Sequence, residues 1–113
     1  MSKLDTLRAP RFVPVAVGEI ELRCRAMRFG EAEEFEAAGA ALDASDTAAV
    51  KVLCAKTLLS FIYDDEGPVV KSAEEAAAAV EDMAVLTCIE LIRAVARANQ
   101  PEREKKGAIG DSN

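Results

Sequence analysis

An alternation of apolar and polar residues dominates the first quarter of the chain. Valines occupy every second position in residues 11–17, and residues 19–26 alternate without a break, as on a strand with one buried face. The residues expected to face the core are Val13, Val15, Val17, Ile20, Leu22, Cys24 and Ala26. Gly18 separates the two segments and permits a tight turn, so the pattern predicts a β-hairpin. Pro14 has no N–H to donate, which places the first strand at the edge of a sheet.

Four later segments carry apolar residues at the three- and four-residue spacing of an amphipathic helix. They cover residues 30–42, 46–63, 72–80 and 82–99. The second segment is the most regular. Its stripe consists of Val50, Leu53, Cys54, Thr57, Leu58, Phe61 and Ile62.

The apolar side of this second helix is broader than a single contact requires. Val52 and Leu59 lie beside the main stripe and widen it. A wide apolar side belongs to a helix that is covered from more than one direction. We therefore expect this helix either to be central in the fold or to contact a partner on a second side.

An acidic turn, Asp64–Pro68, separates the second helix from the third. Read as an EF-hand loop, it would place Glu75 at position twelve, but Val69 would stand where the sharp turn needs glycine. We therefore interpret the segment as a tight turn in which Gly67 adopts a positive φ. Helix resumes at Ser72–Glu75, whose S-x-x-E pattern is a capping box.

These elements predict an α+β fold, with an N-terminal β-hairpin packed against a bundle of three to four α-helices. A hairpin alone cannot bury its apolar face, so helices must cover it. We expect an N-terminal arm at residues 1–10, a single α+β domain at 11–100 and a disordered C-terminal tail at 101–113, where the sequence is polar. Leu4 and Leu7 could dock the arm on its own core or on a neighbour.

Charge is distributed unevenly along the chain. The net charge is −6, but residues 1–28 hold six basic and three acidic residues, whereas residues 29–113 hold eight basic and seventeen acidic ones. The acidic balance argues against nucleic-acid binding. The asymmetry could orient head-to-tail contacts in a homo-oligomer, or both surfaces could simply be solvated.

The sequence offers little for catalysis. It contains no histidine, which removes the commonest general base and metal ligand, and it has no phosphate loop or nucleophile motif. Cys24, Cys54 and Cys88 lie within apolar patterns and are interpreted as reduced, buried thiols, of which the last two could meet across a helix pair. We therefore expect no enzymatic activity, no cofactor and no bound metal.

The ends and hydropathy of the chain bear on its location. Its N-terminus lacks the hydrophobic run of a signal peptide. No apolar stretch reaches the ~18 residues that span a bilayer. We therefore expect a protein that is not associated with a membrane.

Five residues are candidates for contact with a partner. Leu59, Leu86 and Leu91 lie off the main helical stripes and could be exposed. Arg23 and Arg25 point outward on the second strand in the alternating pattern. The alternatives are that the leucines belong to the core and that the arginines only prevent edge-to-edge aggregation.

Three stretches resemble parts of the tail assembly chaperones of long-tailed phages and related prophages. They are the opening Met1–Asp5 with its hairpin, Ile20–Met27 with the acidic helix start Glu31–Phe35, and Leu58–Val70 with the capped helix after it. The resemblance covers roughly residues 1–100. The chain departs from the family pattern at residues 28–30, where a Ser or Thr cap is usual.

The resemblance implies a protein of the host bacterial cytoplasm. Such a chaperone binds the long, helical tape measure protein, keeps it soluble and promotes tail tube assembly through the tail tube protein. It is a homo-oligomer with no enzymatic role. The alternative is a structural adaptor or connector subunit of a phage particle, without a chaperone role.

Overall fold

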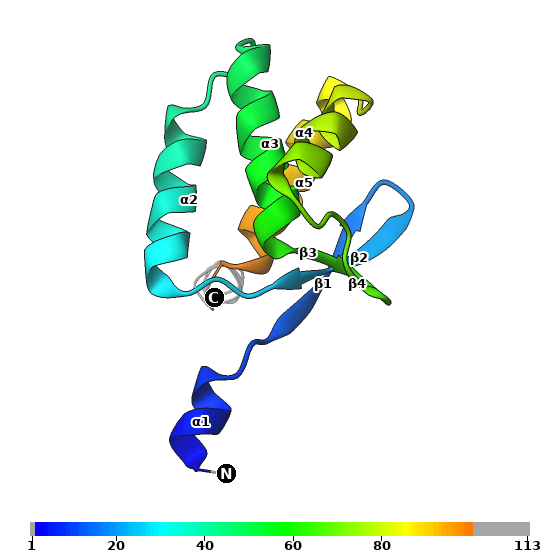
Figure 1. Cartoon of the computed structure of the whole chain (residues 1–113). Coiled ribbons are helices and arrows are strands. Elements are labelled where there is room, and N and C mark those ends of the chain that lie inside the picture. Colours follow the sequence, from blue (N-terminus) through cyan, green and yellow to red (C-terminus); the bar gives the residue numbers. More distant parts are fainter. Residues whose placement is uncertain (1, 101–113) are drawn as a thin grey trace, which may run out of the picture.

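An antiparallel sheet and a group of helices make up the α+β fold, which confirms the predicted fold class (Figure 1). The computed structural model describes residues 2–100 of the 113-residue chain, so the expected disordered tail lies outside the described residues. The elements are α1 (Lys3–Arg8), β1 (Phe12–Val17), β2 (Ile20–Arg25), α2 (Phe29–Ala41), α3 (Thr47–Phe61), β3 (Ile62–Asp64), β4 (Gly67–Pro68), α4 (Ala73–Glu81) and α5 (Val85–Ala98). The strands lie in the order β1-β2-β3-β4.

The predicted hairpin is formed by β1 and β2. Val15 lies opposite Leu22, and Gly18 turns the chain with a φ of 62°. Within the described sheet β1 pairs only with β2, so the edge position predicted from Pro14 is confirmed. The expectation that Ile20 faces the core is wrong, because its side chain is 63% exposed. α5 packs along β1 and leaves the start of β2 uncovered.

Two short strands extend the sheet beyond the predicted hairpin. Helix was expected to continue to residue 63, but α3 ends at Phe61 and the chain becomes extended to pair with β2. Cys24 lies opposite Ile62 in this pairing. The acidic turn is a tight turn as predicted, with Gly67 at a φ of 132° and the Glu66 N–H donating to Asp64 Oδ1 at 2.7 Å.

The remaining helices lie close to their predicted positions. Ser72 caps α4 as expected, because its Oγ accepts a hydrogen bond from the Glu75 N–H at 3.1 Å. The last helix begins at Val85 instead of residue 82. The N-terminal arm contains the unpredicted short helix α1, whose N-cap Ser2 accepts from the Asp5 N–H at 3.1 Å. Figure 1 shows α1 standing away from the rest of the molecule.

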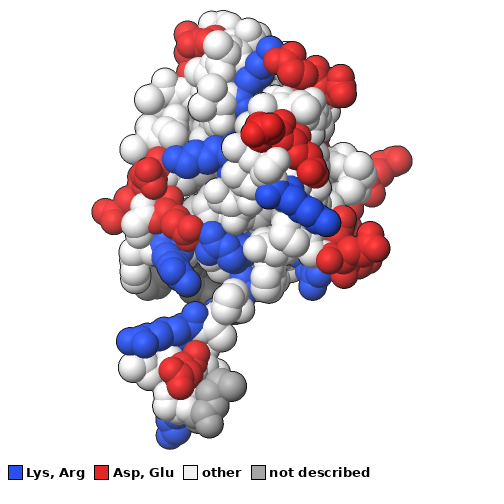
Figure 2. Space-filling view, in the orientation of Figure 1, with Lys and Arg blue, Asp and Glu red and all other residues white. Residues whose placement is uncertain are grey.

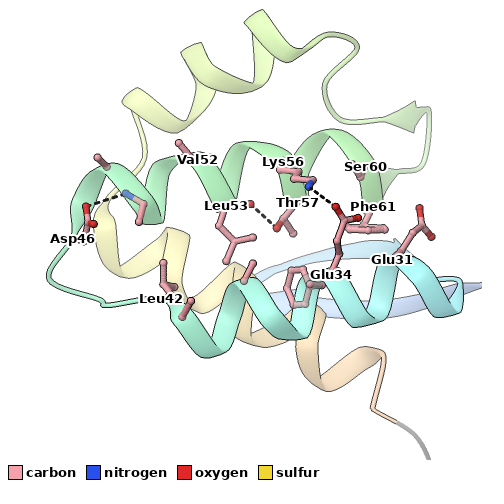
Figure 3. Close-up of a pocket in the computed structure, with 15 residues that line it drawn as sticks. Glu31, Glu34, Leu42, Asp46, Val52, Leu53, Lys56, Thr57, Ser60 and Phe61 are labelled. Atoms are coloured by element: carbon pink, nitrogen blue, oxygen red, sulfur yellow. Dashed lines mark hydrogen bonds and ion pairs between the residues drawn. The ribbon is translucent and has the colours of Figure 1, made fainter.

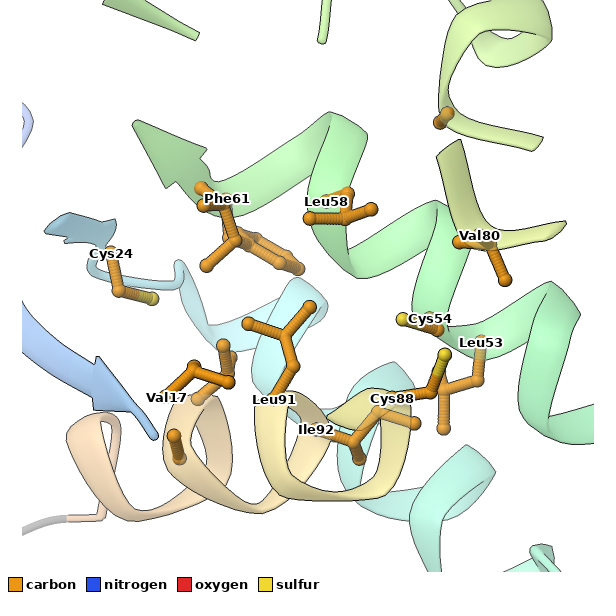
Figure 4. Close-up of a cluster of buried hydrophobic side chains, with 14 of the residues drawn as sticks. Val17, Cys24, Leu53, Cys54, Leu58, Phe61, Val80, Cys88, Leu91 and Ile92 are labelled. Carbon is orange, nitrogen blue, oxygen red and sulfur yellow. The ribbon is translucent and has the colours of Figure 1, made fainter. Parts of the chain in front are cut away.

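The hydrophobic core lies between the sheet and the helices α3, α4 and α5 (Figure 4). Its largest fully buried side chains are Ile62, Leu91, Val50, Val95, Thr57, Cys24 and Cys54. By contrast, none of the residues Phe29–Ala41 in α2 is buried, although Phe35 packs against the core with part of its surface. α2 is therefore a peripheral helix beside a well-packed body.

All three cysteines are free and buried, as the sequence predicts. Cys54 of α3 and Cys88 of α5 meet across the helix pair, as Figure 4 shows. Burial, together with the neighbouring Cys88 side chain, raises the pKa of Cys54 to about 12. Burial also raises the pKa of Cys24, despite a hydrogen bond from Asn99 Nδ2 to its sulfur at 3.6 Å. These thiols therefore serve as small apolar core residues.

Candidate functional site

A groove runs between α2 and α3 (Figure 3). Its volume is about 610 Å³. Its apolar lining comprises Phe35, Ala38, Ala41, Leu42, Ala48, Ala49, Val52, Leu53 and Phe61. Ala38 and Ala41 of α2 line part of the groove, and their methyl groups are too small to fill the space between the two helices.

One end of the groove is held by a charged contact between β2 and α2. Arg25 and Glu31 form two parallel hydrogen bonds, Nη1 to Oε1 at 3.1 Å and Nη2 to Oε2 at 2.8 Å. Arg25 also donates to the Ser60 carbonyl at 3.3 Å and lies over the Phe61 ring, 5.1 Å from its centroid. Such paired geometry is among the stronger ion-pair arrangements, so this contact fixes the start of α2 against α3.

Glu31 also closes the first turn of α2. Its Oε1 accepts the Arg28 N–H at 2.9 Å, which compensates for the Ser or Thr cap that the sequence lacks. The side-chain hydrogen bond from Arg25 is the main reason why the pKa of Glu31 is lowered, and the same contact raises the pKa of Arg25. The carboxylate is therefore ionised at neutral pH.

Two aromatic rings close the bottom of the groove near this charged contact. Phe35 of α2 and Phe61 of α3 meet edge to face, with ring centroids 6.4 Å apart at an interplanar angle of 90°. This geometry is favourable for aromatic pairs. Thr57, on the floor, donates from Oγ1 to the Leu53 carbonyl at 2.7 Å, so its hydroxyl is satisfied within α3. The floor therefore presents apolar surface.

The rim of the groove is mainly acidic. Glu31, Glu34 and Asp46 line it, with Lys56 as the one basic residue among its lining. The Lys56–Glu34 pair spans the groove at 3.7 Å, but both side chains are exposed, so the contact contributes little. The position of α2 therefore depends more on the Arg25–Glu31 and Phe35–Phe61 contacts than on this pair.

The outer side of α3 carries apolar residues beyond the groove. Val52 is 70% exposed and lines both this groove and a shallower one of about 450 Å³ between α3 and α4. Leu59 lies partly buried in the shallower groove. α3 packs against α4, α5 and the sheet, so it is central in the fold and still presents apolar surface.

The five candidate contact residues differ in how exposed they are in the structure. Leu86 is 80% exposed at the start of α5, whereas Leu91 is 2% exposed, so the expectation that Leu91 could lie on the surface is wrong. Leu91 points inward because it lies on the side of α5 that faces the core. Arg23 is exposed and donates from Nη2 to the Asp64 carbonyl at 2.6 Å. Arg25 does not point freely outward, because α2 and Phe61 cover it.

None of these five residues lines the groove between α2 and α3. Sequence reasoning missed Phe35, Ala38 and Leu42 as wall residues, because the helical spacing in residues 30–42 does not show what the apolar side of that helix contacts. The signal that could have found the groove was the combination of Val52 off the main stripe with a neighbouring helix rich in alanine.

The side chains that line the groove are mostly apolar. Over residues 2–100, no group of three or more His, Cys, Asp or Glu side chains is placed to hold a metal ion. Within the same range, no helix is long and apolar enough to cross a bilayer. The lining is mainly apolar and the rim is charged, a combination that is chemically suited to an amphipathic ligand.

Comparisons with protein-family models, with curated proteins and with solved structures found no match to this chain.

Proposed function

We propose that this protein is a non-enzymatic tail assembly chaperone of a phage or prophage, acting in the cytoplasm of the host bacterium. It would bind the tape measure protein, keep it soluble and promote assembly of the tail tube with the tail tube protein. The observation that carries the proposal is the open apolar groove between α2 and α3. The family resemblance of residues 1–100 supplies the identity of the client.

A helix-in-groove contact fits the chemistry of the groove. An amphipathic helix buries its apolar face in such a groove and leaves its polar face in water. The tape measure protein expected from the resemblance is long and helical, so it would offer many such faces. Several copies bound along one client would give strong overall binding from individually weak contacts.

The charge of the chain suits a solubilising role. Each bound copy would add its net charge of −6 to the complex. Repulsion between negatively charged complexes would then oppose their aggregation. The acidic rim at Glu34 and Asp46 favours client helices that carry basic residues beside their apolar face.

Co-expression with the tape measure protein of the same phage or prophage tests the proposal. The wild-type protein is expected to raise the soluble fraction of the client. Ala38→Glu, which places a carboxylate on the groove wall, is expected to lower that fraction several-fold. Ala78→Glu is the matched control, because Ala78 is an exposed alanine of α4 outside both grooves of α3. Equal soluble fractions for the two variants, or no effect of the wild type, would contradict the proposal.

Mass spectrometry of purified particles separates the chaperone from the structural adaptor. A chaperone is expected to be absent from finished tails. An adaptor would be present in stoichiometric amounts. That result would contradict the chaperone function and favour the adaptor.

A further inference from the structure

We propose that α1 of one copy of this protein binds in the α2–α3 groove of a second copy. The inference uses the groove but does not depend on the identity of any client. It assigns a role to the N-terminal arm, which the proposed chaperone function leaves unexplained.

The arm presents apolar side chains away from the core. Leu4 and Leu7, three residues apart on α1, are 54% and 81% exposed, and no residue of Lys3–Arg8 is buried. A six-residue helix is marginal in water by itself, even with the Ser2 cap. Packing of these two leucines on another apolar surface would stabilise the helix and remove the exposed area from water.

The groove matches the arm in size and polarity. A helix of six residues is about 9 Å long, and a hollow of about 610 Å³ falls within the range of pockets that enclose compact ligands. Ala38 and Leu42 on one wall and Val52 on the other offer apolar contacts for the leucines. The weak Lys56–Glu34 pair is the main contact across the opening.

The charges of the two partners are complementary. Residues 2–11 carry three basic side chains and one acidic one, a net charge of +2. α2 carries four glutamates and no basic residue, and Asp46 adds to the acidic rim. Figure 2 shows acidic side chains over α2 and mainly basic ones on the protruding arm. This complementarity would orient the arm along α2 and speed association.

The connection between α1 and the sheet favours binding of α1 to the groove of a second copy over binding to the groove of its own chain. The Arg11 carbonyl accepts the Ala26 N–H at 2.7 Å, which fixes Arg11 at the end of the hairpin. Only Ala9 and Pro10 then link Arg11 to α1, so this short linker leaves the arm little freedom to fold back along its own chain. Figure 1 shows α1 standing apart below the sheet and α2, in contact with neither α2 nor α3.

Cross-linking between two variants tests the contact directly. Leu7→Cys and Ala38→Cys are prepared separately in the full chain, mixed and oxidised, and the mixed disulfide is measured by intact mass. Its yield is expected to exceed several-fold that of Leu7→Cys mixed with Ala78→Cys, the control outside the groove. The native cysteines are buried and should not compete. Equal yields would overturn the proposal, as would an exclusively intramolecular disulfide in the Leu7→Cys, Ala38→Cys double variant.

Sedimentation of the pure protein provides a second measurement. The wild type is expected to self-associate, and Leu7→Asp is expected to shift it to monomer while the chain stays folded, as judged by circular dichroism. Leu86→Asp is the matched control, because Leu86 is 80% exposed and Leu7 is 81% exposed. A monomeric wild type, or equal effects of the two variants, would overturn the proposal. No client is present, so this result is separate from the test of chaperone function.

Discussion

Arg25 and Glu31 show how one side-chain pair determines the position of a helix. Alternation along the strand predicts an outward arginine, but the guanidinium lies over Phe61 and binds the first turn of α2. Alternation of apolar and polar residues predicts on which side of the sheet a residue lies. It does not predict which other element packs on that side. The Arg25 side chain lies over Phe61 with its guanidinium paired to Glu31, so it stabilises the fold instead of facing a partner.

The Arg25–Glu31 contact makes a defined contribution to acid stability. Because the pKa of Glu31 is lowered in the folded protein, its stabilising effect is present above the ordinary glutamate pKa of about 4.3 and is lost as pH falls through the lowered folded pKa. Glu31→Gln is expected to lower the free energy of unfolding at pH 7 by about 0.5–1 kcal/mol. Urea unfolding over a pH series should then show a flatter acid-side decline. Glu33→Gln, a change of an exposed glutamate on the same helix, should leave both quantities near wild type.

The core thiols give a second prediction for single residues. Cys54 has a pKa raised to about 12, and all three cysteines are buried, so the native protein holds few accessible thiolates at pH 8. A thiol-specific reagent should label the native chain slowly and the urea-unfolded chain completely, with three labels per molecule. Rapid labelling of the native protein would show that α3 and α5 separate easily.

Among the elements, α2 differs most from its neighbours in how it is held. It packs through the partly buried Phe35 and Leu42, whereas α3 and α5 contribute much of the core. Stability within a protein varies with such local packing. The α2 helix should therefore open more readily than the helices beside it.

Hydrogen exchange measures this difference. Amides of Phe29–Ala41 are expected to exchange many times faster than those of Thr47–Phe61, although the two helices are similar in length. Loss of the Arg25 contact in Arg25→Met should speed exchange in α2 further and leave α3 unchanged. Equal protection of the two helices would show that α2 is part of the cooperative core.

The elements that could be predicted from the sequence are those with long local patterns. The hairpin and the helices α3 and α4 follow from alternation, helical spacing and the cap at Ser72. β3 was missed because Ile62 continues the helical stripe, and only pairing with β2 makes this segment extended. α1 is too short for a reliable pattern. Val52 beside an alanine-rich helix was the only sequence signal for the groove, and the distance between α2 and α3 emerges only from the Phe35–Phe61 contact.

At the scale of the whole molecule, charge and shape divide the chain into two parts. A basic arm with exposed leucines stands away from an acidic body that carries an apolar groove (Figures 1 and 2). In the proposed assembly, the arm and a client helix would compete for the same groove. Free copies would then associate with one another until a client of higher affinity displaces the arm.

The alanines on the groove walls bear on how selective such a surface can be. Ala38, Ala41, Ala48 and Ala49 each contribute only a methyl group, so these parts of the walls are smooth. Recognition of one sequence over another usually needs shaped hollows or buried polar partners that penalise the wrong side chain. A helix lying between smooth walls could slide by a turn and still bury a similar apolar area. The groove would therefore tolerate sequence divergence in whatever it binds, which suits a client that presents many non-identical repeats of one amphipathic pattern.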